Sequence, residues 1–240
     1  ASTPGAVAAA VSRPLRHTLD ASAGLSRDVG LLRLGVTGAL TRQTYEDAEL
    51  SDGTTVSQRE RDSTLATATL RAGYAVSPAL IPFAEAEIGR RFYDQKLDNS
   101  GYARSADRYA LRGGVELDLG EKLRGEIAAG WLSERPDDDR LAAVSGLSLS
   151  GDLSWSPVRG TVVGLAASTT VEGATTPGDS GSLLYSGSVS VERELRANLT
   201  GRALAGLDWR DYSGGGSDTI MRGEASLTWW MNRHAGVTAR

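Results

Sequence analysis

The sequence contains no cysteine, which excludes a disulfide framework, a thiolate metal site and a cysteine nucleophile. It contains two histidines, His17 and His234, too few for a histidine-rich zinc site. No uncharged apolar run approaches the roughly 18–20 residues that a membrane-spanning helix needs. The 26 basic and 30 acidic residues are mixed along the chain, so the basic patch of a nucleic-acid binder is missing. No phosphate-binding glycine loop or dinucleotide fingerprint is present, and no cofactor is expected.

What the sequence does have is alternation of apolar and polar residues with a period of two, which predicts strands rather than helices. In residues 108–119, apolar positions alternate with arginine, glycine and acidic positions. The sequence predicts about twelve strands of about 10–16 residues, longer than the usual mode of about 5–6 in soluble proteins. The other strands are expected near 17–26, 31–45, 63–76, 81–93, 122–132, 145–155, 160–172, 184–194, 197–212, 218–230 and from about 235.

The connections between these strands alternate strictly between short turns and long polar loops. Such alternation places all short turns at one end of an up-and-down meander and all long loops at the other, as in outer-membrane barrels. A propeller also repeats in units of this length, but its blades have shorter strands. The short turns are expected near 27–30, 77–80, 119–121, 156–159, 195–198 and 231–234, and the long loops near 46–62, 94–107, 134–143, 173–182 and 213–217.

Most aromatic residues lie within a few positions of a predicted strand end. A soluble sandwich places large aromatic residues mid-strand, where burial is greatest, whereas a membrane barrel collects them in two girdles at the headgroups. The sequence therefore predicts an aromatic girdle formed by Tyr45, Tyr74, Phe92, Trp131, Trp155, Trp209 and Trp229.

A membrane location requires the sheet to be closed, because every backbone N–H and C=O in hydrocarbon must be paired within the protein. The apolar face is light, with leucine, valine, alanine and glycine and only two phenylalanines in the chain. Contact with lipid needs apolarity but not the bulk of a soluble core. We expect an all-β fold, a transmembrane antiparallel up-and-down β-barrel of which about twelve strands are visible. A secreted β-solenoid or adhesin and a soluble sandwich are the alternatives.

The opposite face carries charges of both signs on neighbouring strands, at positions that can pair across the sheet. One interpretation is that the charges only satisfy each other and stiffen the wall, and another is an eyelet that selects solutes by charge. Between 145 and 190 this face turns to serine, threonine and glycine, a smooth wall that would suit a sugar-like solute. The predicted lumen-lining residues are Arg71, Glu85, Glu87, Arg91, Arg112, Glu116, Arg124, Glu126, Arg202, Arg222 and Glu224.

No enzymatic site can be assembled. Residues 178–181 read GDSG, the string around the nucleophile of chymotrypsin-like proteases, but a triad also needs an oriented histidine base. His17 lies in the first predicted strand and His234 in a short turn at the opposite end. The acidic stretches 94–99 and 137–139 lack the spacing of a calcium loop, so solvated loops are expected there and no metal site.

The order of the strand–turn units resembles the outer-membrane β-barrel porin type 2 family, found mostly in alphaproteobacteria. The resemblance runs from about residue 15 onward and implies a barrel that carries a signal peptide and reaches the outer membrane. Some members are suspected of roles around surface polysaccharide, and the family has no accepted catalytic residues. The segments that carry it are 74–94, 115–131, 153–168 and 191–212, followed by LTWWMNRHAGVTA at 227–239.

The expected organisation is a lead-in or flexible segment over 1–14, which lacks alternation, and a barrel over 15–240. The chain stops just inside a strand at Arg240, so closure is expected to need further strands or partner contacts.

The sequence favours a porin-like channel with a charge-laddered lumen in the outer membrane of a Gram-negative bacterium. The alternative is a structural or adaptor barrel that anchors a cell-surface or polysaccharide-associated assembly. Expected partners are outer-membrane lipid, lipopolysaccharide, and an envelope protein or a second copy of the chain, with no nucleic acid.

Overall fold

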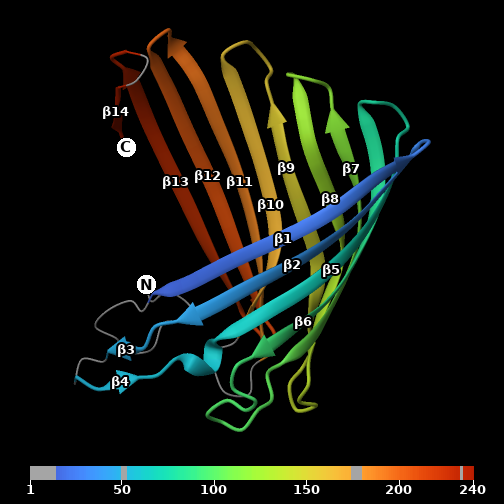
Figure 1. The fold of residues 1–240 in the computed structure, drawn as a ribbon. Coiled ribbons are helices and arrows are strands. Elements are labelled where there is room, and N and C mark those ends of the chain that lie inside the picture. Colours follow the sequence, from blue (N-terminus) through green and yellow to red (C-terminus); the bar gives the residue numbers. More distant parts are fainter. Residues whose placement is uncertain (1–14, 50–52, 174–179, 233–234) are drawn as a thin grey trace.

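The computed structural model describes residues 15–49, 53–173, 180–232 and 235–240. Twelve strands form one antiparallel sheet in which each strand pairs with its neighbours along the chain, except that β2 pairs with β5 (Figure 1). The predicted all-β, up-and-down meander is therefore confirmed. Its strands are β1 (Arg16–Val29), β2 (Leu32–Tyr45), β5 (Ser63–Tyr74), β6 (Leu80–Tyr93), β7 (Ala106–Asp118), β8 (Leu123–Pro136), β9 (Val144–Trp155), β10 (Thr161–Gly173), β11 (Gly181–Arg196), β12 (Leu199–Tyr212), β13 (Ser217–Trp230) and β14 (Gly236–Ala239).

The long connection between β2 and β5 contains structure of its own. It carries a two-residue hairpin, β3 (Ala48–Glu49) with β4 (Thr55–Val56), and one turn of 3-10 helix, η1 (Arg59–Arg61). The sequence predicted only a polar loop here, because two-residue strands are too short for alternation to be visible. Among the residues described, no helix has the length and apolarity needed to cross a membrane.

The sheet is open in the part of the chain that the structure describes. Strand β1 pairs only with β2, and β14 pairs only with β13, so each leaves one edge without a partner. The predicted segment 1–14 lies outside the described residues.

The strand register divides the sheet into two chemically distinct faces. One row of directly opposed residues is apolar across seven strands, from β1 to β9, and an adjacent row is polar. Because successive side chains of a strand point to opposite faces, these two rows lie on opposite sides of the sheet. We call the two sides the apolar face and the polar face. The apolar row is Leu25, Val36, Leu70, Ala86, Leu111, Trp131 and Leu147, and the polar row is Gly35, Arg71, Glu85, Arg112, Gly130 and Ser148.

Most of the apolar face is uncovered. Leu25 is 85% exposed, Leu111 64% and Met221 79%, and no second layer of protein packs over these side chains in the described residues. A soluble protein rarely exposes so large a continuous apolar surface. The face therefore has the character of a surface that meets a nonpolar solvent.

Among the described residues, one cluster of buried apolar residues forms where the sheet overlaps itself, near the loop ends of the strands. Val171 of β10 and Leu183 of β11 pack there against Leu132 and Val144 of β8 and β9. The register places Val171 and Leu183 on the apolar face, but Leu132 and Val144 on the polar face. The ends of β10 and β11 therefore lie across the polar face of β8 and β9 instead of continuing beside β9.

Close packing on the polar face depends on a glycine. A Cβ atom at Gly114 of β7 would come within 2.6 Å of Cζ of Phe83 and within 2.7 Å of Cβ of Ala128. The adjacent Gly113 lies on the apolar face, where a Cβ atom would meet only the Phe83 carbonyl oxygen, at 3.9 Å.

We expect Gly114→Ala to lower the free energy of unfolding by about 1–3 kcal/mol, because overpacking forces the neighbouring strands to shift. Gly113→Ala, the matched control, should change it by less than about 0.5 kcal/mol. Urea unfolding in lipid vesicles, followed by tryptophan fluorescence, measures both. Equal midpoints for the two variants would contradict this account of the packing.

Candidate functional site

The polar face of β1 to β8 carries a continuous network of ion pairs, which we call the charge ladder. It joins five arginines to six carboxylates, and every arginine except Arg91 contacts more than one carboxylate. The paired register supplies this arrangement because it sets residues of adjacent strands opposite or diagonal to one another. The members are Asp28, Arg33, Arg71, Glu85, Glu87, Arg91, Arg108, Arg112, Glu116, Glu126 and Glu134.

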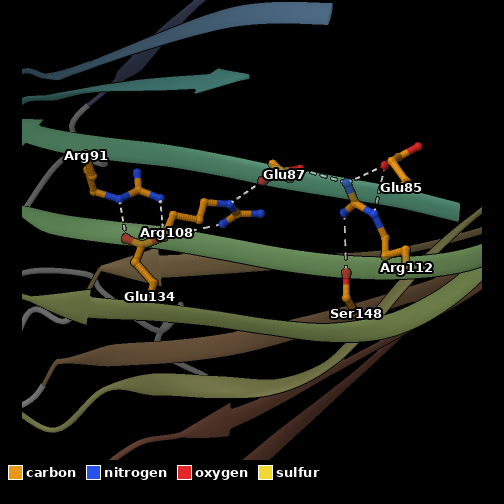
Figure 2. A network of polar contacts seen from close by, with 7 residues as sticks. All are labelled: Glu85, Glu87, Arg91, Arg108, Arg112, Glu134 and Ser148. Atoms are coloured by element: carbon orange, nitrogen blue, oxygen red, sulfur yellow. Dashed lines mark hydrogen bonds and ion pairs between the residues drawn. The ribbon is translucent and has the colours of Figure 1, made fainter. Parts of the chain in front are cut away.

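The loop-end part of the charge ladder is buried and centres on Glu134 of β8 (Figure 2). Arg91 of β6 donates two hydrogen bonds to it, from Nε to Oε1 at 2.6 Å and from Nη2 to Oε2 at 3.2 Å. Arg108 of β7 reaches Oε2 of Glu134 from Nη1 at 3.4 Å. Glu134 is 5% exposed, Arg91 7% and Arg108 9%. One carboxylate is thus shared by two buried guanidinium groups.

The pairing continues from Arg108 toward the middle of the sheet. Arg108 Nε donates to Glu87 Oε1 at 2.7 Å, and Arg112 Nη2 donates to Glu87 Oε2, also at 2.7 Å. Arg112 Nη2 also bonds Oε1 of Glu85 at 2.6 Å, while its Nη1 bonds the Ser148 hydroxyl at 3.4 Å. Figure 2 shows these side chains side by side, with Glu85 and Glu87 on β6, Arg108 and Arg112 on β7, and Ser148 on β9. Each carboxylate oxygen of Glu87 is therefore held by a different arginine.

The turn-end part of the charge ladder is more exposed and centres on Arg71 of β5. Its guanidinium carbon lies 3.5 Å from the ring centroid of Phe83, and its Nη2 bonds Glu126 at 2.8 Å and Glu116 at 3.3 Å. Glu116 also accepts a bond from Arg33 Nη1 at 3.0 Å. The stacking on Phe83 holds the Arg71 side chain flat against the sheet, where it faces two carboxylates.

The polar face of β10 and β11 is different, and its centre is uncharged. Serines occupy neighbouring positions on it, such as Ser150, Ser168 and Ser186, which are directly opposed on β9, β10 and β11. This is the serine-rich wall that the sequence indicated. Isolated ion pairs flank it: Glu172 with Arg210 at 2.6 Å, Asp208 with Arg222 at 2.9 Å, and Glu224 with Arg240 at 2.6 Å.

The residues predicted to line a lumen all lie on the polar face. The structure joins seven of them in the charge ladder and places Arg222 and Glu224 in the isolated pairs, whereas Arg124 and Arg202 lie on the same face apart from the charge ladder. The seven are Arg71, Glu85, Glu87, Arg91, Arg112, Glu116 and Glu126.

The sequence analysis missed Glu134, the residue at the centre of the buried part. It was assigned to the loop 134–143, whereas β8 runs on to Pro136. The alternation of 122–132 does continue to Glu134, but Leu132 is apolar on the polar face and interrupts the visible pattern. Leu132 is tolerated there because the overlapping end of β11 covers it completely. Arg33 and Asp28 were also not among the predicted site residues.

Six of the seven predicted girdle residues lie on the apolar face and each is at least 42% exposed; five are near a strand end, whereas Trp131 lies near the middle of β8, which extends to Pro136. These six are Tyr74, Phe92, Trp131, Trp155, Trp209 and Trp229. Tyr45 differs, because the register places it on the polar face, where the Arg61 guanidinium lies 4.2 Å from its ring centroid.

The acidic loops are tied down by arginines. Asp138 accepts hydrogen bonds from Arg140 Nη2 at 2.7 Å and from the Ala103 amide at 3.2 Å, which links two loops. The Arg140 guanidinium, together with the backbone amides of Arg140 and Ala103, holds the pKa of Asp138 well below its usual range. Burial opposes ionisation of Asp98, but the Tyr102 amide, Arg104 and the Ser100 amide outweigh it and lower the pKa. While they are ionised, both carboxylates hold their loops in place, and we call the contacts of Asp98 and Asp138 the loop clasps.

The protease-like string offers no triad in the described residues. Gly178, Asp179 and His234 lie outside them, and His17 pairs with Glu46 at 3.1 Å on the exposed strand β1.

Residues 1–240 match the model of the family described as Putative beta-barrel porin 2. The chain belongs to this family. The resemblance seen in the sequence is thereby confirmed, and the family name indicates a porin-like β-barrel, which points to an outer-membrane location. Neither a curated protein nor a solved structure matches the chain.

We expect Glu134→Gln to lower the free energy of unfolding by about 3–5 kcal/mol, because it leaves two buried arginines without their shared carboxylate. Asp107→Asn is the matched control, since the half-exposed pair of Asp107 with Arg90 should contribute only about 0–1 kcal/mol. The double variant Glu134→Gln/Arg91→Gln should be more stable than Glu134→Gln alone. Urea unfolding in vesicles measures all three, and a loss no larger than that of Asp107→Asn would contradict the burial of this cluster.

The loop clasps should open in acid. Because the pKa values of Asp98 and Asp138 are lowered in the folded state, their stabilising contribution is fully present above the ordinary aspartate pKa of about 3.9. It is lost as the pH falls through the lowered values. The amide proton shifts of Ser100, Tyr102 and Ala103 should therefore stay constant from neutral pH to about pH 4 and change only below it. A midpoint at or above the ordinary value would contradict the clasps.

Proposed function

We propose that the chain forms the wall of a porin-like channel in the outer membrane of a Gram-negative bacterium. The apolar face meets lipid and the polar face lines the water-filled lumen. The observation that carries this proposal is the register, which sets a row of apolar residues across β2 to β8 directly beside a polar row that is charged on β5, β6 and β7. Such alternation of an apolar outside and a polar inside is the pattern of membrane barrels.

The proposed girdle residues support this orientation. Aromatic rings favour the headgroup level of a membrane, and five of the predicted girdle residues are exposed on the apolar face near the ends of the strands. Outer-membrane lipid and lipopolysaccharide are therefore the proposed surroundings of the apolar face. An envelope protein or a second copy of the chain is the proposed partner for the open edges of β1 and β14. We propose no nucleic-acid partner.

Most charges of the proposed lumen are paired with one another in ion pairs. In the charge ladder every carboxylate is within ion-pair distance of an arginine, so the wall presents little net field to a passing ion. The serine-rich wall on β9 to β11 offers hydrogen bonds without charge. We propose transport of small polar solutes with weak selectivity between anions and cations.

Planar-bilayer recordings of the purified full-length protein test this function. We expect stable conductance steps, and a reversal potential near zero across a salt gradient. Glu87→Gln should shift the reversal potential toward anion preference, because Arg108 and Arg112 both lose a counter-charge. Asp107→Asn, on the apolar-face side of β7, is the control and should cause no shift. Absence of conductance from correctly folded protein would remove the channel proposal.

A structural or adaptor barrel is the second candidate, and one observation favours it. The overlapping ends of β10 and β11 and the buried part of the charge ladder fill the polar face at the loop end, as a plugged wall would. A barrel of this kind would anchor a cell-surface assembly through its long loops. Co-purification of a stoichiometric envelope partner, together with the absence of conductance, would favour it over the channel.

A further inference from the structure

The ladder between β9 and β10 stops halfway. It comprises six residue pairs, from Val163 opposite Trp155 to Ser168 opposite Ser150. Both strands continue beyond this point, since β9 pairs with β8 as far as Val144 and β10 pairs with β11 as far as Gly173. The loop-side half of β9 therefore has a free edge within the sheet. We call residues 169–173 of β10 and 181–185 of β11 the tucked end.

Side chains of the tucked end occupy the free edge of β9. The Thr169 hydroxyl accepts the Leu149 N–H at 2.9 Å, and the Tyr185 hydroxyl interacts with the Leu147 backbone. In an uninterrupted antiparallel ladder, the backbone groups of every second residue bond the neighbouring strand. Leu147 and Leu149 are two such residues, so hydroxyl groups stand in for the missing ladder bonds. An unpaired edge is thereby satisfied without the strand that the pattern calls for.

The tucked end lies on the polar face of β8 and β9. Its own alternation would instead place its apolar residues on the apolar face of the sheet. Leu183 and Tyr185 approach Gly146 so closely that a Cβ atom there would lie 2.5 Å from Leu183 Cδ1 and 2.8 Å from Tyr185 Oη. A Cβ atom at Gly173 would likewise lie 2.8 Å from the Tyr93 hydroxyl oxygen of β6. The tucked end thus covers the Arg91–Glu134 part of the charge ladder and narrows the loop end of the polar face.

The same residues have a second position available. If the register of the six pairs is extended, Val171 falls opposite Leu147 and Glu172 falls opposite Gly146. Val171, Leu183 and Tyr185 then share the apolar face with Leu147, and Glu172 stays on the polar face beside its partner Arg210. Alternation continues through the tucked end except at Leu184, an apolar residue on the polar face, so the sequence is also compatible with this in-line position.

We propose that the tucked end is a gate that moves between the observed position, which covers the charge ladder, and an in-line position paired with β9. In the in-line position, backbone hydrogen bonds between β9 and β10 replace the contacts of the Thr169 and Tyr185 hydroxyls with the β9 backbone. The apolar side chains of the tucked end then contact lipid in place of Leu132 and Val144. Two positions of similar chemistry are what a bistable element requires. This inference rests on the proposed channel function, because the gate would control access to the lumen.

Two cysteine pairs distinguish the positions, and the chain has no cysteine of its own. Gly146→Cys/Leu183→Cys can form a disulfide only in the tucked position, where these residues are in contact. Leu147→Cys/Val171→Cys can form a disulfide only in the in-line position. In the tucked position Val171 lies on the polar-face side of β9, whereas the Leu147 side chain points to the apolar face. Disulfide formation in full-length protein in vesicles is read on non-reducing gels, without reference to conductance.

We expect both disulfides to form, the first to lower the conductance and the second to raise it, with both effects reversed by reductant. Gly146→Val, which displaces Leu183 and Tyr185, should also raise the conductance, whereas Gly187→Ala, with open space around it, should not. If only one of the two disulfides forms, or if both locked proteins conduct alike, the gate is overturned. If the wild-type protein does not conduct while both disulfides form, the movement stands and the channel function fails.

Discussion

The hydrogen-bonded register of neighbouring antiparallel strands is the constraint on which the rest of this molecule depends. A shift by one residue would move every side chain of a strand to the other face. The row that contains Leu70, Leu111 and Trp131 would then be broken by Glu85 or Arg112. The cost of placing those charges in a nonpolar surrounding, and of separating them from their partners, fixes the register more firmly than backbone bonds alone.

The charge ladder shows what this register makes possible. The two partners of each pair lie on different strands and meet because the strands are aligned. Apart from Asp28 with Arg33, which face each other across one hairpin, each pair joins residues 14 or more positions apart, such as Arg71 with Glu85 or Arg91 with Glu134. Burial makes these pairs mutually dependent, since removing one partner leaves the other desolvated. The buried part near Glu134 therefore serves cohesion, while the exposed part near Arg71 faces the space that we assign to solutes.

The overlap of β10 and β11 on β8 and β9 gives the sheet its one apolar core. Elsewhere the apolar face is left to its surroundings, and stability rests on strand pairing and on ion pairs. At the overlap, Leu132 and Val171 pack as residues of a soluble core do. In the in-line position Val171 and Leu183 would exchange this contact for lipid, while Leu132 and Val144 on the polar face would lose their cover. The gate and the membrane wall therefore depend on the same apolar side chains.

The sequence by itself determined the strands, their order, the two faces and the chemistry of each face. Alternation is a local signal, and it is strong because water and lipid treat apolar and charged side chains so differently. It placed Arg71, Glu87 and Arg112 correctly on one face, because each follows from its own strand. Only the tertiary structure decided which charges pair, that Glu134 lies within β8 and is buried, and that β10 leaves β9 at Ser168. Those outcomes depend on contacts between segments distant in sequence, and a leucine at position 132 reads as an interruption until the strand that covers it is in place.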